Sequence, residues 1–270
     1  MRLSTSAFFL VFCLATSSFT HSQTQIPTAI LQTPASSQQA QPVVRDDAAI
    51  SLVTASIGVM GGAAINAVTT FVINGNETLL SESGTFVWKE SGSSFRCTYT
   101  ASTSGTIDEE VMSAGRFYRI HAGATKPTAP ILVKGHFSPG IPSLKLLQVL
   151  NDPSANLTFE GNKQIGTQTL VAVKSVEGTK SIDKLLTTKT WYFDPNTKVL
   201  TALDYYVPEN RALSGGVILR AMFSDYRPVS GVMMPFLIDI DTNDKQLPIT
   251  YVINSAALNA DLAPAVFQVQ

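Results

Sequence analysis

The sequence predicts a mainly β protein, an α+β fold with few helices, in which one curled antiparallel sheet has about ten strands. The main observation is the stretch Trp191–Asn254, where apolar residues recur at every second position between turn-forming residues. This alternation is typical of strands that bury one face of a sheet. The second observation is that only two short stretches of the chain have the apolar spacing of a helix.

The first residues are predicted to be a secretory signal peptide, residues 1–22. Arg2 supplies the positive charge at its start, and Ala7–Ala15 is an apolar run too short to span a membrane. Small residues permit cleavage after Ser22, and cleavage after Ser17 fits the same rule. The mature chain is therefore expected to have no transmembrane segment.

The mature chain is expected to be a periplasmic or secreted protein of a Gram-negative-type bacterium. Cys13 lies in the apolar run and leaves with it, because the bulky Phe12 stands where lipid attachment requires a small residue. Cys97 is then the only cysteine, so no disulfide can form within the chain, which fits the periplasm. Residues 23–45, rich in Gln, Pro, Ser and Ala, are predicted to be a flexible linker, and residues 46–270 a single domain.

A helix is predicted from Asp46 to Met60. Asp46 and Asp47 suit its N-terminal cap and dipole, and Gly61 and Gly62 end it. Its apolar residues form a single stripe, so the helix is expected to lie on an apolar surface, as a lid over the mouth of the curled sheet. This lid stripe consists of Ile50, Val53, Ile57 and Met60.

The middle of the chain is expected to contain several strands and the second helix. Pro142–Leu150 is predicted as a short helix because proline stands near its start and leucines fall on one side. Pro127–Gly140 is predicted to be mostly loop, and Glu177–Thr188 stays open between a loop and a helical turn. The strands expected here are Val68–Asn74, Thr85–Glu90, Phe95–Thr100, Arg116–Ala122, Leu157–Glu160 and Thr169–Lys174.

Turn residues divide the C-terminal part of the chain into hairpins. In the turn Asp194–Thr197 proline occupies the second position, where its fixed φ fits, and Asp and Asn suit the flanking positions. Further turns are expected at Arg227–Gly231 and Thr242–Lys245. The strands expected here are Lys189–Phe193, Val199–Val207, Val217–Tyr226, Val232–Asp241 and Leu247–Asn254.

No catalytic constellation, cofactor or metal site is predicted, so the chain is expected not to be an enzyme. Ser181 and Lys184 match the S-x-x-K spacing of acyl-serine enzymes, but the companion S-D-N and K-T-G motifs are absent. His121 and His136 have no Cys or carboxylate at metal-ligand spacing, and Cys97 is predicted to pack in the core. A net charge of −1 without a basic run gives no reason to expect a nucleic-acid partner.

The remaining feature is a set of large apolar residues on the predicted strands. A curled sheet of about ten strands encloses more width than side chains fill easily, and two short helices are available to close it. We therefore expect an apolar ligand-binding cavity, although a plain filled core and the choice of the lining face stay open. The candidate cavity-lining residues are Phe86, Trp88, Phe95, Tyr99, Trp191, Phe193, Phe223, Met234 and Phe236.

The chain resembles the LolA/LolB-like superfamily of periplasmic lipoprotein-carrier folds, and especially its secreted bacterial members. The resemblance follows the order of the elements and spans most of Asp46–Gln270. Its motifs are the end of the first helix at Met60–Gly62, the stretch Leu157–Gly161, the stretch Trp191–Thr197 and the stretch Phe223–Pro235. The resemblance implies an unclosed half-barrel whose concave face holds acyl chains beneath helices.

The favoured function is that of a periplasmic binding or carrier protein for a lipid or the acyl group of a lipoprotein, acting as a monomer. The first alternative is a non-catalytic sensing or protein-interaction module of the envelope that uses the same concave face. The second alternative is a secreted hydrolase, for which the sequence offers Ser181 and Lys184 alone.

Overall fold

The computed structural model describes residues 42–79, 82–128, 141–178, 181–207, 216–242 and 248–269. The predicted signal peptide, most of the predicted linker, His136 and most of the predicted turn Thr242–Lys245 lie outside these residues. Within them, no helix is long and apolar enough to cross a membrane.

The described strands form one antiparallel sheet of 13 strands that is not closed into a barrel, as the half-barrel prediction requires. The strands of the first half are β1 (Thr70–Leu79), β2 (Glu82–Ser91), β3 (Ser94–Ala101), β4 (Ile107–Ser113), β5 (Arg116–His121) and β6 (Ala124–Thr128). Those of the second half are β7 (Asn156–Ile165), β8 (Gln168–Val176), β9 (Lys189–Phe193), β10 (Leu200–Val207), β11 (Val217–Val229), β12 (Val232–Thr242) and β13 (Ile249–Leu258).

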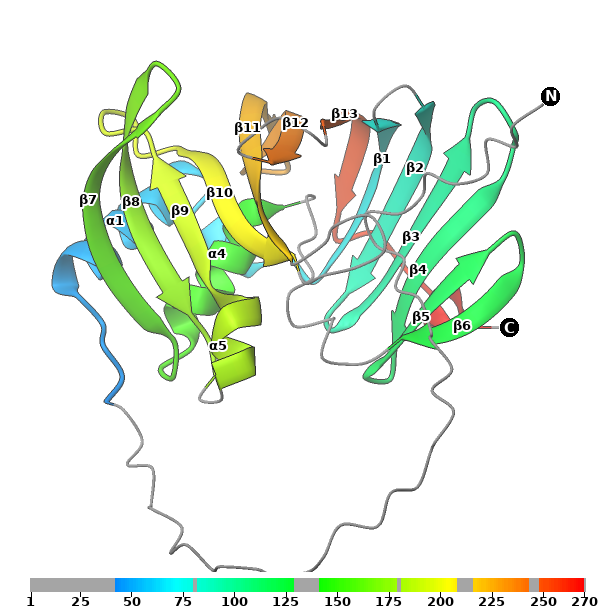
Figure 1. Cartoon of the computed structure of the whole chain (residues 1–270), viewed down its shortest axis with the longest axis horizontal. Helices are drawn as coiled ribbons and strands as arrows, with labels where there is room; N and C mark the ends of the chain where they lie inside the picture. Colours follow the sequence, from blue (N-terminus) through cyan, green and yellow to red (C-terminus); the bar gives the residue numbers. More distant parts are fainter. Residues whose placement is uncertain are drawn as a thin grey trace, which may run out of the picture.

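The sheet consists of two meanders that share one central junction. Strands β1–β6 and β7–β13 each run to their sequence neighbours, and β1 pairs with β13 to join the two halves. Strands β6 and β7 follow each other along the described chain but form the opposite edges of the sheet. Figure 1 shows the two halves curling around a common concave side.

Helices α1, α4 and α5 lie on the half of the sheet that contains β7–β10 (Figure 1). Helix α1 (Asp47–Val59) contacts α4 and β7, and the short helix α2 (Ala63–Asn66) contacts α4 (Pro142–Asn151). Helix α5 (Ser181–Thr187) contacts β8 and β10, and the short 3-10 helix η1 (Pro264–Phe267) contacts β3 and β4. The segment that the sequence left open between loop and helix is therefore helical in its second part.

The predicted boundaries of the first helix are confirmed, but one of the predicted caps is wrong. Asp46 stands at the N-cap position without a side-chain cap hydrogen bond. Its carboxylate instead accepts a hydrogen bond of 2.9 Å from the backbone N–H of Phe159, which ties the start of α1 to β7. At the other end, Gly61 and Gly62 have φ of +137° and +50°, which favours glycine and ends the helix as predicted.

The structure has more strands than predicted, because two of them carry sequences that look like loops. Strand β4 contains Asp108, Glu109 and Glu110, which resemble a solvated turn but are paired across the sheet. Strand β6 contains Pro127, which is tolerated because β6 is an edge strand. The turn predicted at Arg227–Gly231 is shorter, since β11 runs to Val229 and only two residues with positive φ connect it to β12.

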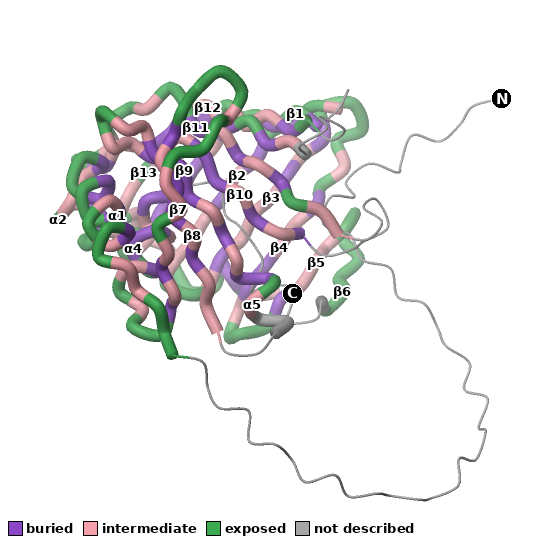
Figure 2. Tube along the Cα trace, turned by 60° about the vertical axis from the view of Figure 1, so that its left-hand side comes forward, coloured by how far each residue is buried: buried purple, intermediate pink, exposed green. Residues whose placement is uncertain are grey.

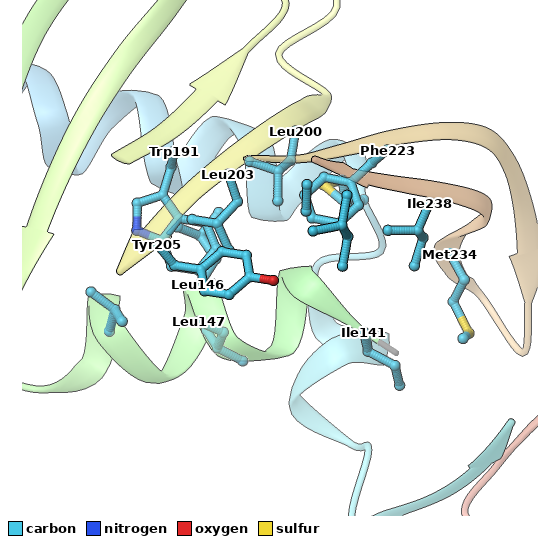
Figure 3. Close-up of a cluster of buried hydrophobic side chains, with 14 of the residues drawn as sticks. Ile141, Leu146, Leu147, Trp191, Leu200, Leu203, Tyr205, Phe223, Met234 and Ile238 are labelled. Carbon is cyan, nitrogen blue, oxygen red and sulfur yellow. The ribbon is translucent and has the colours of Figure 1, made fainter. Parts of the chain in front are cut away.

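One hydrophobic core lies between the concave face of the sheet and helices α1, α2 and α4. Figure 2 shows buried residues along the middle of the strands and exposed residues along the loops and the outer side of α1. Figure 3 shows the part of this core in which Leu146 and Leu147 of α4 face side chains of β9 and β10 such as Trp191 and Leu203.

Candidate functional site

The concave face contains an apolar hollow near the junction of the two halves. Across β1, β2 and β3 the register aligns Ile73, Trp88 and Cys97 in one row. The space inside it that a water-sized sphere can occupy is about 20 Å³. This is room for about one water molecule, so the hollow is a narrow apolar slot. Its lining residues are Ile73, Phe86, Trp88, Cys97, Ile238, Tyr251 and Ile253.

Aromatic contacts hold the wall of the hollow in place. The rings of Phe86 and Tyr251 meet edge to face, with 5.4 Å between centroids and 88° between planes. Trp88 stacks on Phe95 at 5.2 Å, and Phe95 contacts Phe117 at 5.9 Å. Such contacts fix ring orientation beyond what area burial alone achieves, so the wall is preformed.

The nine predicted cavity-lining residues are all buried, but they do not all line the hollow. Phe86 and Trp88 do, and Tyr99 lies opposite Phe86 in the β2–β3 register. The other six belong to the same core cluster as Phe86 and Trp88. These six are Phe95, Trp191, Phe193, Phe223, Met234 and Phe236.

The predicted lid stripe faces the core. Val53 and Met60 are fully buried, Ile57 is 6% exposed, and Ile50 packs partly buried against the core. The backbone C=O of Met60 accepts a hydrogen bond of 2.9 Å from the N–H of Met233, so the end of α1 is fixed to β12. Whether α1 moves as a lid stays a prediction.

Three acids lie beside the hollow, and none was predicted as a site residue; Glu77 is buried, and Glu90 and Glu110 are partly buried. Burial and the charge of Glu110 raise the pKa of Glu77 to about 8, although Tyr251 donates a hydrogen bond to its carboxyl. Burial also raises the pKa of Glu110, which pairs with Arg119 at 3.0 Å. Burial raises the pKa of Glu90 to about 7, where the indole Nε1 of Trp88 donates to Glu90 at 3.3 Å.

A second charged group lies on the concave face of the other half of the sheet. The side chain of Lys189 in β9 is 1% exposed, and its Nζ lies 3.9 Å from Oε1 of Glu177. Lys145 of α4 lies 3.6 Å from Oε2 of the same carboxylate. Burial, followed by the charge of Lys145, lowers the pKa of Lys189 to about 8.

A signal for these charged residues is present in the sequence. Glu77 follows Phe71 and Ile73 at every second position, and Lys189 precedes Trp191 and Phe193 in the same way. A charged residue at an apolar position of an alternating strand is expected to be buried, and buried charges usually have a structural or functional partner.

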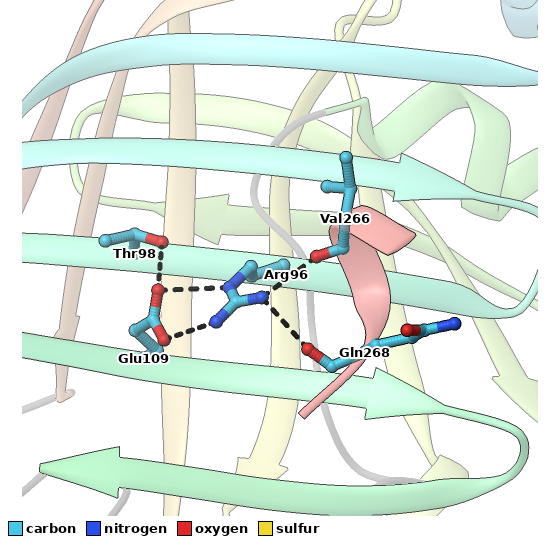
Figure 4. A network of polar contacts seen from close by, with 5 residues as sticks. All are labelled: Arg96, Thr98, Glu109, Val266 and Gln268. Atoms are coloured by element: carbon cyan, nitrogen blue, oxygen red, sulfur yellow. Dashed lines mark hydrogen bonds and ion pairs between the residues drawn. The ribbon is translucent and has the colours of Figure 1, made fainter. Parts of the chain in front are cut away.

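The outer face of the first half carries a polar network that holds the end of the chain (Figure 4). The guanidinium of Arg96 donates to both oxygens of Glu109, at 3.0 and 2.6 Å, and to the backbone C=O groups of Val266 and Gln268. Burial opposes ionisation of Glu109, but hydrogen bonds from Arg96 and Thr98 outweigh it and hold the pKa below its usual value. This arrangement is structural, because it faces away from the hollow.

The other candidate residues form no catalytic or metal constellation in the described part of the chain. Nδ1 of His121 lies 2.5 Å from Oδ1 of Asp108, which lies opposite it on the neighbouring strand β4. The described residues contain no group of three or more potential metal ligands. Ser181 begins α5, but its side chain lies outside the described part, so its spacing to Lys184 gains no geometric support.

Comparison of the structure with solved structures finds relatives that share the fold at low sequence identity. A DUF1329 family protein from Desulfovibrio piger matches with a TM-score of 0.53 and 11% identity over 83% of this chain and 98% of that chain. A LolA superfamily protein from Nitrosomonas europaea matches with a TM-score of 0.55 and 11% identity over 82% and 97%. A domain from Vibrio parahaemolyticus, assigned to outer-membrane lipoprotein sorting, matches with a TM-score of 0.53 and 9% identity over 82% and 96%.

The comparisons by sequence find no relative, so the fold is assigned from the comparison of structures. No protein-family model matches the sequence, and no curated protein sequence matches it. Identities of 9–11% over nearly the full length of the matched chains show a shared fold and nothing finer. The chain therefore has a LolA-like fold.

Proposed function

We propose that the chain is a binding or carrier protein of the bacterial envelope that holds an acyl chain of a lipid or lipoprotein in the hollow on its concave face. The observation that carries this proposal is the hollow itself, whose preformed walls are almost entirely apolar. The predicted signal peptide and the lipoprotein-sorting assignment of the Vibrio parahaemolyticus domain support the same class of function.

The physical basis of binding is burial of methylene groups. Each methylene that leaves water contributes about 0.8 kcal/mol, so several buried methylenes give measurable affinity. The enclosed space is small, so an acyl chain must displace side chains of the wall to enter. The lining residues come from strands of both halves, and a long chain would extend from them along the concave face.

The proposal is tested by filling the hollow. Cys97→Phe places a ring among Trp88, Ile238 and Tyr251, which occupies the space that an acyl chain would take. We expect the affinity for fluorophore-labelled palmitic acid to fall about 10-fold or more. The matched control is Thr100→Phe on the same strand, because its side chain lies on the opposite face.

Thermal unfolding of both variants shows whether the added ring has damaged the fold, since overpacking costs about 1–3 kcal/mol. The carrier function is refuted if the wild type does not bind the probe. The assignment to the hollow is refuted if folded Cys97→Phe binds the probe as tightly as Thr100→Phe does.

A further inference from the structure

Lys189 is a buried cation whose hydrogen-bonding capacity is not used by the described residues. Its ammonium carries three donors, yet the nearest carboxylate oxygen among these residues, Oε1 of Glu177, is 3.9 Å away, beyond hydrogen-bond distance. That oxygen is itself buried without a hydrogen-bond partner. The side chain of Lys189 is 1% exposed and its ammonium has no acceptor within hydrogen-bond distance among the described residues, so the structure retains it against a free-energy penalty.

A second cation, Lys145, lies beside the same carboxylate. Lys145 projects from α4 to within 3.6 Å of Oε2 of Glu177, and its side chain is 36% exposed. Two lysines thus share one carboxylate. The other nearby acid, Glu90, interacts electrostatically with Lys145 but accepts its hydrogen bond from Trp88. Among these charged groups, Lys189 is therefore the one whose ammonium an anionic oxygen of a ligand would stabilise most.

Lys189 lies on the same concave face of the sheet as the hollow. In the sheet register Lys189 lies beside Tyr205 of β10, on the concave face with Trp191. Figure 3 shows Tyr205 and Trp191 on the side of the sheet that faces Leu146 of α4. Tyr205 belongs to the hydrophobic core against which Tyr251, in the wall of the hollow, also packs.

The hollow and the surroundings of Lys189 differ in how well they accommodate a negative charge. Burial raises the pKa of Glu77 and of Glu110, so a negative charge is unfavourable beside the hollow, whereas Lys145 and Lys189 favour one at the other end of the concave face. An amphiphile with an anionic head is therefore oriented in one direction only, with its apolar chain toward Tyr251.

We propose that Lys189, assisted by Lys145, is the binding site for the anionic headgroup of an amphiphile, a carboxylate or a phosphodiester with one negative charge. This inference rests on the proposed carrier function and adds the chemical class and the orientation of the ligand. The headgroup oxygen accepts the hydrogen bonds that Lys189 does not make with Glu177. Charge-assisted hydrogen bonds of this kind are stronger than neutral ones, so the site discriminates charged from neutral amphiphiles.

The test compares fluorophore-labelled palmitic acid with its methyl ester, which has the same chain and no charge. The wild type is expected to bind the acid about 10-fold or more tightly than the ester. Lys189→Met is expected to abolish this preference by weakening the acid alone, and Lys145→Met is expected to reduce it. The matched control is Lys174→Met on the neighbouring strand, because Lys174 pairs with Thr190 on the opposite face and its removal leaves the preference intact.

The outcomes separate this inference from the proposed function. If Lys189→Met and Lys145→Met both retain the wild-type preference, the headgroup site is wrong while the carrier function stands. If the wild type binds neither probe, the headgroup site and the carrier function are both refuted. Lys189→Met leaves Glu177 paired with Lys145, so the variant is expected to remain folded, which thermal unfolding checks. Competition by palmitate and by lysophosphatidylglycerol, whose phosphodiester carries a single charge, shows which of the two headgroups the site prefers.

Discussion

Single charged residues at apolar positions give the concave face its chemical character. Glu77 and Lys189 each occupy a position in an alternating strand where a large apolar residue would pack. Burial moves their pKa values in opposite directions, and both values reach about 8. The protonation of the concave face therefore changes near neutral pH, which is open to direct measurement.

Glu77 is predicted to make the protein less stable as the pH rises. Its pKa in the folded state is raised to about 8, above a usual value of 4.5. Between these values the folded state binds more protons than the unfolded state, so the free energy of unfolding falls with rising pH. Glu77→Gln cannot ionise, and its free energy of unfolding should fall less between about pH 5 and pH 8.

Urea unfolding at several pH values measures this slope. The control Glu160→Gln, at a surface position where Glu160 pairs with Lys163, should keep the wild-type slope. Glu90, with its pKa raised to about 7, contributes a slope of the same sign in every variant. Equal slopes for the wild type and Glu77→Gln would show that Glu77 is not buried in the way described.

At the scale of the elements, two glycines near the end of α1 are expected to respond in opposite ways to replacement by alanine. Gly58 lies within α1 with open space around it, whereas a Cβ on Gly61 would lie 2.8 Å from the backbone oxygen of Gly231. Gly58→Ala should raise the free energy of unfolding by about 0.5–1 kcal/mol, because alanine favours the helix. Gly61→Ala should lower it by about 1–3 kcal/mol, because its φ of +137° and the contact both oppose a side chain.

Denaturant unfolding of the two variants provides the comparison. Each serves as the control of the other, since the chemical change is the same and the positions are three residues apart. A Gly61→Ala variant as stable as the wild type would mean that the end of α1 is not pressed against the hairpin.

The lid hypothesis concerns the whole of α1. Ile57→Asp removes a buried contact worth about 1.5–3 kcal/mol and should loosen α1 more than the sheet. Hydrogen exchange should then be faster within residues 46–62 and unchanged in β1–β5. The control is Val59→Asp, on the outer side of the same helix, where the side chain is 48% exposed. Faster exchange throughout the sheet in Ile57→Asp would show that α1 is an ordinary part of the core.

Elements whose local pattern agrees with their environment were predictable from the sequence. Helix α1 and the hairpin at Asp194–Thr197 are of this kind, since the side chain of Asp194 accepts hydrogen bonds from the turn backbone. Strand β4 was not, because its acids are paired by Arg96 and Arg119 of other strands. The pairing of His121 with Asp108 was missed for the same reason. Each of these pairs joins neighbouring strands, so it depends on the register between them, which the pattern within one strand does not give.

For the candidate site, the sequence predicted which residues are buried, but not which of them line the hollow. All nine predicted aromatic and apolar residues are buried, because large apolar residues at alternating positions face the core. Whether such a residue fills space or borders it depends on the curvature of the sheet and on where α1 and α4 lie. Ile253 and Ile238 therefore line the hollow, while Trp191 and Phe193 pack in the core.

At the scale of the whole molecule, the order of the strands creates the binding surface. Because β1 pairs with β13, the two meanders share one concave face, and the hollow draws its residues from both. Helices α1, α4 and α5 lie toward the half with β7–β10 (Figure 1), and the lining residues of the hollow in the described part of the chain all belong to strands. The same arrangement separates the acids of one half from the lysines of the other.

Native mass spectrometry of the exported protein, purified from the bacterial envelope without added lipid, tests the carrier function most directly. We predict that the wild type carries a bound amphiphile whose mass is released on unfolding and identified by fragmentation. Cys97→Phe, purified in the same way, should appear without it, and Thr100→Phe should retain it. A wild-type protein that leaves the envelope as the bare chain, or an amphiphile held equally by Cys97→Phe, would contradict binding in the hollow.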